Sequence, residues 1–173
     1  MNISLGEQSI LGLTLCSALG AGLMGGVFFA FSTSVMRALA RLPAPQGIAA
    51  MQSINIAVIN PLFLAALFGT AATCALLIAW SLKMWPRPGT AYLLAGGLLY
   101  LAGAILATIL FNVPLNDALA KLDPAGSDSA VLWNGYVSSW TAWNHLRTAA
   151  SLLAAAALMF GFCRLLRIAG TPP

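Results

Sequence analysis

Four long stretches of the sequence carry no formal charge, and they constrain the fold more than any other feature. They lie between Glu7 and Arg37, between Arg41 and Lys83, between Arg87 and Asp117, and between Arg147 and Arg164. A helix that crosses a hydrocarbon core of roughly 30 Å needs about 20 mostly apolar residues. Backbone N–H and C=O groups find no water in lipid, so the apolar stretches are predicted to be helical. We therefore expect four membrane spans, over residues 9–31, 61–82, 90–111 and 144–163.

The composition excludes the ordinary soluble classes. Only 7% of the 173 residues are charged and 60% are hydrophobic, whereas soluble domains average about 25% and 45–50%. A disordered chain would show the opposite bias, and a net charge of +4 is too small to indicate nucleic-acid binding. We expect one domain over residues 1–173, an all-α four-transmembrane-helix bundle. It would be built from two tandem helical hairpins, with amphipathic extensions at one membrane face.

The charges between the spans decide the orientation only weakly. Lysine and arginine are equally numerous on the two sides of the predicted membrane, so the positive-inside rule gives a tie. Two of the bases on one side, Lys121 and Arg147, are candidates for partners within the fold, and three aspartates share that side. We therefore expect a multi-pass protein of a bacterial inner membrane with both termini cytoplasmic. The first span lacks a basic flank and is too long for a signal peptide, so we expect it to be retained.

The chain contains a candidate internal repeat. Residues 31–42 align without gaps on residues 111–122, with five of twelve positions identical. Each segment follows a predicted span and precedes a proline, which favours a duplicated hairpin. In the first span, small residues recur at every fourth position, and we expect this row to face the bundle interior because it lets backbones approach closely. The row consists of Ala18, Gly22, Gly26 and Ala30.

Polar side chains are predicted to gather at one end of the bundle. Counting about 1.5 Å of rise per residue along each span brings one set to a common level: Asn60, Asn112, Asn144, His145 and Arg147. Asn116 follows Asn112 on the same helical face, and Gln52 and Asn55 form a polar face before the second span. A further stripe recurs at i+3/i+4 along a helix expected to begin after Asp128, with Trp143 and His145 flanking it. The stripe contains Trp133, Tyr136, Trp140, Asn144, Arg147 and Ser151.

Each of these features also has a structural interpretation. The aromatic stripe can be an interfacial belt, and the asparagines can be helix caps or interhelical contacts. Arg147 can extend to lipid headgroups or pair with Asp117, and a lone His145 can be a hydrogen-bonded structural residue. The convergence of the polar residues on one level favours a pocket.

Most standard sites are missing from the sequence. The single histidine excludes a three-histidine zinc site and a bis-histidine haem, and no span holds the carboxylates of a di-iron centre. No P-loop, dinucleotide fingerprint or nucleophile elbow is present, and the three cysteines have no metal-ligand spacing. The predicted pocket suits a flat, apolar ligand that carries phenol or carbonyl oxygens. In it, Trp140 and Trp143 would stack on the ligand, and His145 would accept a proton, as histidine commonly does in general acid–base catalysis.

Two motifs resemble a known family. They are Asn112-Val-Pro-Leu-Asn116 and Trp140-Thr-Ala-Trp143-Asn144-His145-Leu-Arg147-Thr148, with Met51-Gln52 and Asn55 upstream. The chain is similar to the anthrone oxygenase family of small four-span membrane proteins over about residues 12–165. The resemblance implies oxidation of an anthrone to an anthraquinone, without a conventional cofactor.

These observations lead to a set of site assignments. We predict His145 as the base and Arg147 as the second catalytic residue, with substrate bound by Asn60, Asn112, Asn116, Trp140, Trp143 and Asn144. The expected partners are membrane lipid and a hydrophobic aromatic or quinone-like molecule, with a homo-oligomer left open. No cofactor, metal or nucleic acid is expected. Two other functions compete with an oxygenase: a non-catalytic quinone- or lipid-binding subunit that assists a redox partner, and a structural membrane protein.

Overall fold

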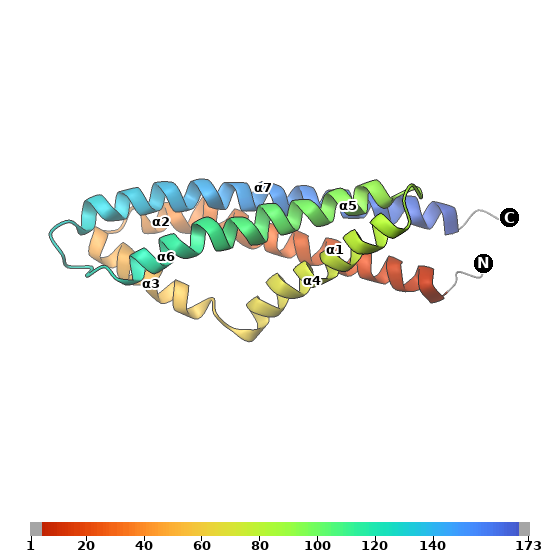
Figure 1. Cartoon of the computed structure of the whole chain (residues 1–173). Helices are drawn as coiled ribbons and strands as arrows, with labels where there is room; N and C mark the ends of the chain where they lie inside the picture. Colours follow the sequence, from red (N-terminus) through yellow and green to blue (C-terminus); the bar gives the residue numbers. More distant parts are fainter. Residues whose placement is uncertain (1–4, 170–173) are drawn as a thin grey trace.

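The computed structural model describes residues 5–169, and every regular element in that range is helical. The elements are α1 (Leu5–Ala30), η1 (Phe31–Val35), α2 (Met36–Leu39), α3 (Ala44–Ala57), α4 (Pro61–Lys83), α5 (Thr90–Leu98), η2 (Leu99–Leu106), η3 (Thr108–Asn112), α6 (Val113–Ala120) and α7 (Ser129–Ala169). The three η segments are π-helical stretches within otherwise continuous helices. α7 begins directly after Asp128, as the sequence predicted, and runs the length of the molecule (Figure 1).

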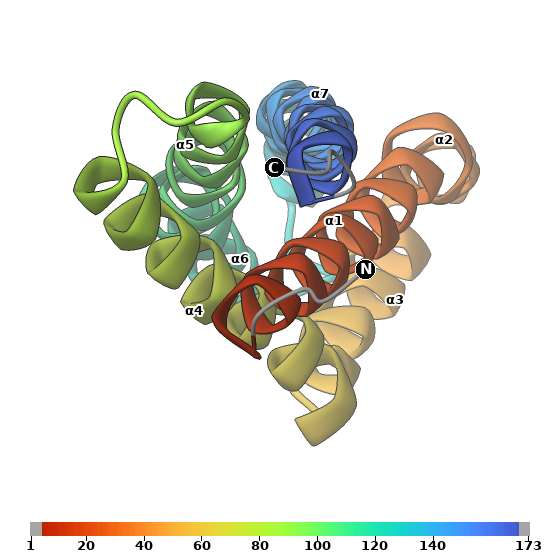
Figure 2. The same cartoon turned by 90° about the vertical axis from the view of Figure 1, so that its right-hand side faces the viewer.

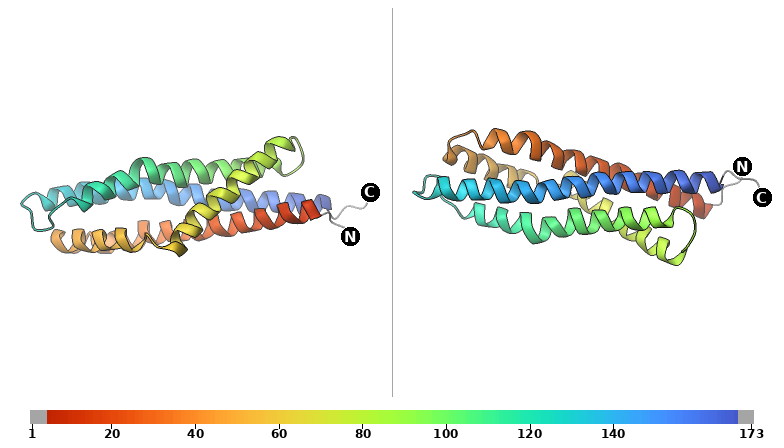
Figure 3. Two further views of the ribbon diagram at one scale, coloured as in Figure 1. Left: turned by 60° about the horizontal axis from the view of Figure 1, so that its bottom comes forward. Right: turned by 90° about the horizontal axis from the view of Figure 1, so that it is seen from above.

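The long helices form a four-helix bundle, which confirms the expected fold class. α7 packs between α1 and α5, while α4 contacts the same two helices on their other side (Figure 2). Beyond α4, the far half of the molecule is built from α2, α3, α6 and the first part of α7 (Figures 1 and 3). The described chain begins and ends at the same end of the bundle (Figure 1).

Four helices are long and apolar enough to cross a membrane: Leu5–Leu39, Pro61–Lys83, Thr90–Ala120 and Ser129–Arg167. Pro61–Lys83 has 23 residues, close to the roughly 20 that a hydrocarbon core requires. The other three have 31 to 39 residues and therefore extend well beyond one membrane thickness. Their extra turns lie at the end away from the termini, where the sequence predicted amphipathic extensions (Figure 3).

Small residues allow the helices to approach closely, although not along the row expected from sequence. A Cβ atom added at Gly25 of α1 would lie 2.8 Å from Leu152 of α7, and one at Gly103 would collide with Ala150. In contrast, Gly26 is exposed and a Cβ there would meet nothing within 4 Å. The predicted row is therefore wrong at Gly26 and Ala30, which face outward. The buried face of α1 follows Ala18, Ala21, Met24, Gly25 and Phe28 instead.

The chain breaks between α3 and α4, and this break shapes the middle of the molecule. Asn60 precedes Pro61 and has an extended backbone, with φ −128° and ψ 157°, because proline disfavours the helical conformation in the residue before it. The Asn60 side chain accepts a hydrogen bond of 3.0 Å from the Phe63 N–H and caps α4. The junction projects from the bundle, and α4 leaves it obliquely (Figures 1 and 3).

The two segments of the proposed repeat share one structural feature. Residues 31–42 begin with the π-helical turn η1, and residues 111–122 begin at the end of η3. A π-helical turn before Pro114 accommodates a residue that has no N–H to continue the α-helical ladder. Duplication of the hairpin remains a prediction.

Candidate functional site

A cavity of about 510 Å³ lies where the α3–α4 junction turns away from the bundle. Its walls come from the end of α1 with η1, from α3, from the start of α4, from η3 with α6, and from the middle of α7. The walls are mainly aromatic and aliphatic, with Phe28, Phe31, Phe63 and Trp140 among them. The break at Asn60–Pro61 thus opens a space that a straight helix would fill.

The outer edge of the cavity is apolar and exposed. Ile56 and Ile59, on either side of the end of α3, are 75% and 71% exposed, and Phe68 and Val113 are also exposed. Exposed aliphatic side chains of this size are disfavoured in water but are stable against lipid chains. The edge is therefore suited to contact with the hydrocarbon of a membrane.

Arg147 is the central polar residue of the cavity, and it is only 6% exposed. One terminal nitrogen, Nη2, donates a hydrogen bond of 2.6 Å to Asn144 Oδ1, and Nη1 donates one of 3.2 Å to Thr108 Oγ1. The guanidinium carbon lies 4.4 Å from the centre of the Phe28 ring and 5.1 Å from that of Trp140. Its Nε has no hydrogen-bond partner. Within residues 5–169, no carboxylate pairs with Arg147, so the predicted alternative of an ion pair with Asp117 is not formed.

Asn144 fixes the position of this guanidinium. Its Nδ2 donates hydrogen bonds of 2.7 Å to the Phe28 carbonyl and to Ser32 Oγ. Phe28 lies just before the π-helical turn η1, and Ser32 lies within it. The amide therefore connects α7 to the end of α1 and directs its oxygen towards Arg147.

Two further asparagines present unpaired polar atoms in the cavity wall. Asn112, 1% exposed, donates from Nδ2 to the Trp140 carbonyl at 3.2 Å, which leaves its Oδ1 buried without a partner. Asn55 of α3 likewise has a buried Nδ2 without an acceptor. Buried polar atoms are nearly always hydrogen-bonded in folded proteins, so these two, together with Arg147 Nε, indicate where a polar ligand atom would bind.

Asn116 holds the aromatic part of the cavity in place. Its Oδ1 accepts a hydrogen bond of 2.9 Å from the Tyr136 hydroxyl and one of 2.8 Å from Trp140 Nε1. The Trp140 ring also lies 5.8 Å from the ring of Phe31, centre to centre. The indole is therefore held by a hydrogen bond from its N–H and by tilted aromatic packing against Phe31.

Five of the eight site residues predicted from sequence line this one cavity: Asn112, Asn116, Trp140, Asn144 and Arg147. Three do not. Asn60 is exposed and caps α4, and Trp143 stacks against Phe111 with ring centres 3.5 Å apart, away from the cavity. His145 is exposed on the outer face of α7.

The helical period explains why His145 and Trp143 lie elsewhere. Successive side chains on an α-helix are rotated by about 100°, so the neighbours of Asn144 point to either side of the cavity face. The stripe itself is confirmed, because Trp133, Tyr136, Trp140, Asn144, Arg147 and Ser151 are all buried. The base role proposed for His145 therefore has no geometric support.

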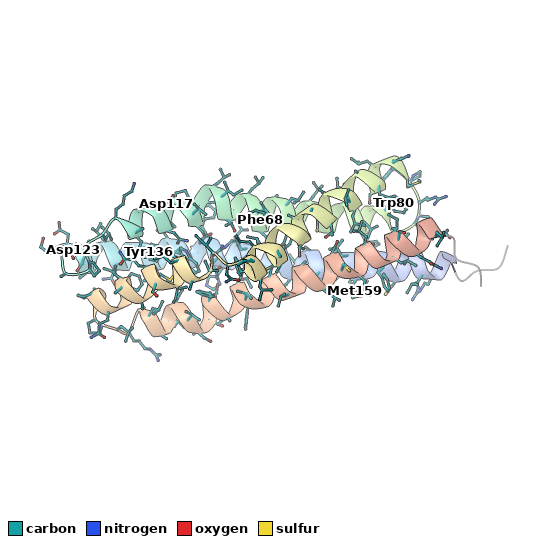
Figure 4. All side chains as sticks on the ribbon, turned by 90° about the horizontal axis from the view of Figure 1, so that it is seen from below. Phe68, Trp80, Asp117, Asp123, Tyr136 and Met159 are labelled. Atoms are coloured by element: carbon teal, nitrogen blue, oxygen red, sulfur yellow. The ribbon has the colours of Figure 1, made fainter. Side chains whose placement is uncertain are left out.

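Asp117 lines the cavity, although it was not among the site residues predicted from sequence. It lies on the α6 face that also carries Val113, Asn116 and Ala120, which line the cavity together with Asn112 at the end of η3. Figure 4 shows Asp117 in the same half of the molecule as Tyr136, away from Trp80. Asp117 follows Val113 by four residues and Asn116 by one, and this spacing could have indicated from sequence that it shares their side of the helix.

The described residues contain no group of three or more His, Cys, Asp or Glu side chains that could hold a metal ion. The chemical groups of the cavity are a guanidinium, a carboxylate, amides, a hydroxyl and aromatic rings.

The fold and the cavity define a class, that of small multi-pass helical membrane proteins with an aromatic-lined cavity between their helices. The family model named "Anthrone oxygenase" matches residues 61–157, which is more than half of the chain. The protein therefore belongs to the anthrone oxygenase family, as the motifs suggested. The match covers α4 to most of α7 and includes all five predicted residues that line the cavity. Comparisons with curated proteins and with solved structures gave no match.

Proposed function

We propose that this protein binds a flat, hydrophobic aromatic ketone or phenol in the cavity and oxidises it with dioxygen. The observation that carries the proposal is Arg147, a guanidinium buried among aromatic rings without a carboxylate partner. Removing an ion from water costs several kcal/mol even after relaxation. An anionic oxygen on the ligand would offset that cost and would accept the hydrogen that Arg147 Nε leaves unpaired.

The size and the lining of the cavity support an aromatic ligand. Its volume of about 510 Å³ falls within the roughly 300–1,000 Å³ typical of small-molecule sites. Phe28, Phe31 and Trp140 offer ring faces and edges, which favour offset stacking or edge-to-face contact with a planar ring system. The apolar edge at Ile56 and Ile59 suits entry of a ligand dissolved in the membrane.

The oxidation needs only dioxygen as the second reactant. Conversion of a ring methylene to a carbonyl by one dioxygen places one oxygen atom in the product and releases the other as water, so no external reductant is consumed. Loss of a proton from the methylene gives an enolate that reacts with dioxygen. Arg147 would stabilise the oxyanion, since a fixed donor in a dry site acts most strongly on developing charge. Asn112 Oδ1 would accept a hydrogen bond from a ligand hydroxyl.

A quinone-binding role is the second candidate, because the unpaired donors of Arg147 and Asn55 also suit a neutral carbonyl oxygen. A purely structural role would require that the polar side chains at this level hydrogen-bond to one another and that no cavity remains between them. The cavity and its unpaired atoms count against that role.

Oxygen consumption tests the proposal directly. The full chain in lipid nanodiscs, supplied with anthrone, is expected to consume dioxygen in a 1:1 ratio to the anthraquinone formed. Arg147→Gln should lower the rate by at least tenfold, whereas Arg164→Gln, which alters an exposed arginine near the other end of α7, should leave it unchanged. Uptake no faster than in protein-free nanodiscs would overturn the proposal. Tight binding of a quinone in that case would establish the second candidate.

A further inference from the structure

The cavity contains two ionisable residues among those that the structure describes, and they have opposite charge. Arg147 enters from α7 and Asp117 from α6. They do not pair with each other, so each remains available to a ligand. An oxidation that begins with loss of a proton needs a base as well as a group that stabilises the oxyanion.

We propose that Asp117 is the catalytic base, which removes the proton from the ring methylene while Arg147 binds the oxygen at the other end of the conjugated system. This inference rests on the proposed oxidation. A single aspartate base combined with hydrogen-bond donors to an enolate oxygen is an established arrangement for proton abstraction next to a carbonyl. It also replaces His145, whose side chain faces away from the cavity.

Arg147 and Asp117 reach the cavity from different helices and at different levels, which suits a ligand between them. Arg147 Nη1 is bonded to Thr108 Oγ1, and Asp117 follows nine residues later in the continuous helix Thr90–Ala120. At no more than 1.5 Å per residue the rise from Thr108 to Asp117 is roughly 13 Å at most, so the carboxylate reaches the cavity at a different level along the helix from the guanidinium. The oxygen and the methylene of the ligand would then meet opposite charges.

The proton has a route out of the site. Asp117 is exposed and lies 27 residues after the start of the helix Thr90–Ala120, beyond the about 20 residues that a hydrocarbon core requires, whereas Arg147 is buried. In the step, the C–H bond breaks, its electron pair moves into the carbonyl to form the enolate, and the proton forms the neutral carboxylic acid of Asp117. The acid then returns its proton to water, while the enolate passes its electrons to dioxygen.

Hydrogen–deuterium exchange isolates this step from the oxidation. The full chain in nanodiscs is mixed with anthrone in D₂O without dioxygen, and deuterium entry at the methylene is followed by mass spectrometry above the protein-free rate. We expect Asp117→Asn to lower both exchange and aerobic oxygen uptake by at least a hundredfold, the scale of general-base catalysis. Anthrone binding, followed by tryptophan quenching, should stay within twofold. Asp117→Glu should restore part of the exchange.

Asp128→Asn is the matched control, because Asp128 is an exposed carboxylate in the loop before α7 and does not line the cavity. It should leave exchange and uptake unchanged. If Asp117→Asn retains exchange within twofold of the unaltered protein while that protein consumes oxygen, the base assignment is overturned and the proposed function stands. If the unaltered protein consumes no oxygen, the proposed function itself fails.

Discussion

Asn144 and Arg147, one turn apart on α7, are joined by a hydrogen bond of 2.6 Å from guanidinium to amide oxygen. An uncharged acceptor therefore occupies the place where buried arginines usually meet a carboxylate. The amide orients the guanidinium without neutralising it, so the positive charge remains available in the cavity.

Replacing this amide by a carboxylate tests that interpretation. Asn144→Asp places an anion next to Arg147 with almost no change in shape, but it removes the donor to the Phe28 carbonyl and Ser32. We expect the affinity for an anionic aromatic probe, such as a hydroxyanthraquinone carboxylate, to fall at least tenfold, or about 1.4 kcal/mol. Isothermal titration in nanodiscs measures this loss. Undiminished affinity would mean that the charge of Arg147 does not face the ligand.

Arg147 should be costly for stability in the absence of ligand. Arg147→Met keeps much of the side-chain volume and removes a buried charge that has no anionic partner. Replacing buried ionic groups by apolar ones is often neutral or stabilising by 1–4 kcal/mol. Thermal unfolding in detergent should therefore show an unchanged or higher midpoint together with lost ligand binding. A clear fall in the midpoint would assign Arg147 a structural role.

His145 should be dispensable for turnover. Its side chain is exposed and lies outside the cavity, so His145→Gln should alter oxygen uptake with anthrone by less than twofold. The matched comparison is Asn112→Leu, which changes a buried residue of the cavity wall and should lower uptake by at least tenfold. Loss of activity in His145→Gln with binding retained would restore the histidine as the base.

Asn116 should be required for a fixed Trp140. Asn116→Leu leaves the Tyr136 hydroxyl and the Trp140 indole N–H without their acceptor, and each unsatisfied group costs about 1–3 kcal/mol. We expect a lower unfolding midpoint and a shift in tryptophan emission. Asn60→Ala provides the comparison, since loss of a helix cap costs about 1 kcal/mol and Asn60 lies outside the cavity. Equal ligand affinity in the unaltered protein, Asn116→Leu and Asn60→Ala would contradict the binding role of Trp140.

The four long helices could be predicted from the sequence, because long stretches without charged residues indicate segments that lie in lipid. The stripe from Trp133 to Ser151 was also predictable, since a single continuous helix preserves its period over many turns. The direction in which a single residue faces, into the bundle or outward, could not be predicted in the same way. Gly26 and His145 were both expected to face inward, but which way each residue faces depends on which neighbouring helix packs against its side of the helix, and that is a tertiary property.

The cavity could be predicted only in part. The dipeptide Asn60–Pro61 signals a break between two helices, but the direction in which α4 departs is decided by its packing against α1 and α5. Counting residues brought Asn60 to the right level without showing that its amide is used as a cap. Asp117 could not be predicted as a cavity residue for the same reason, because its place there depends on the position of α6 beside the break at Asn60–Pro61.

The apolar edge formed by Ile56 and Ile59 has a consequence for how the protein would be assayed. A ligand that enters past these side chains arrives from the lipid phase, so its effective concentration is a mole fraction in the bilayer and not a molarity in buffer. Adding empty vesicles at constant total ligand would dilute it across more lipid and slow binding, while adding buffer would change little. Affinities measured in preparations with different lipid contents are then comparable only after correction for partitioning.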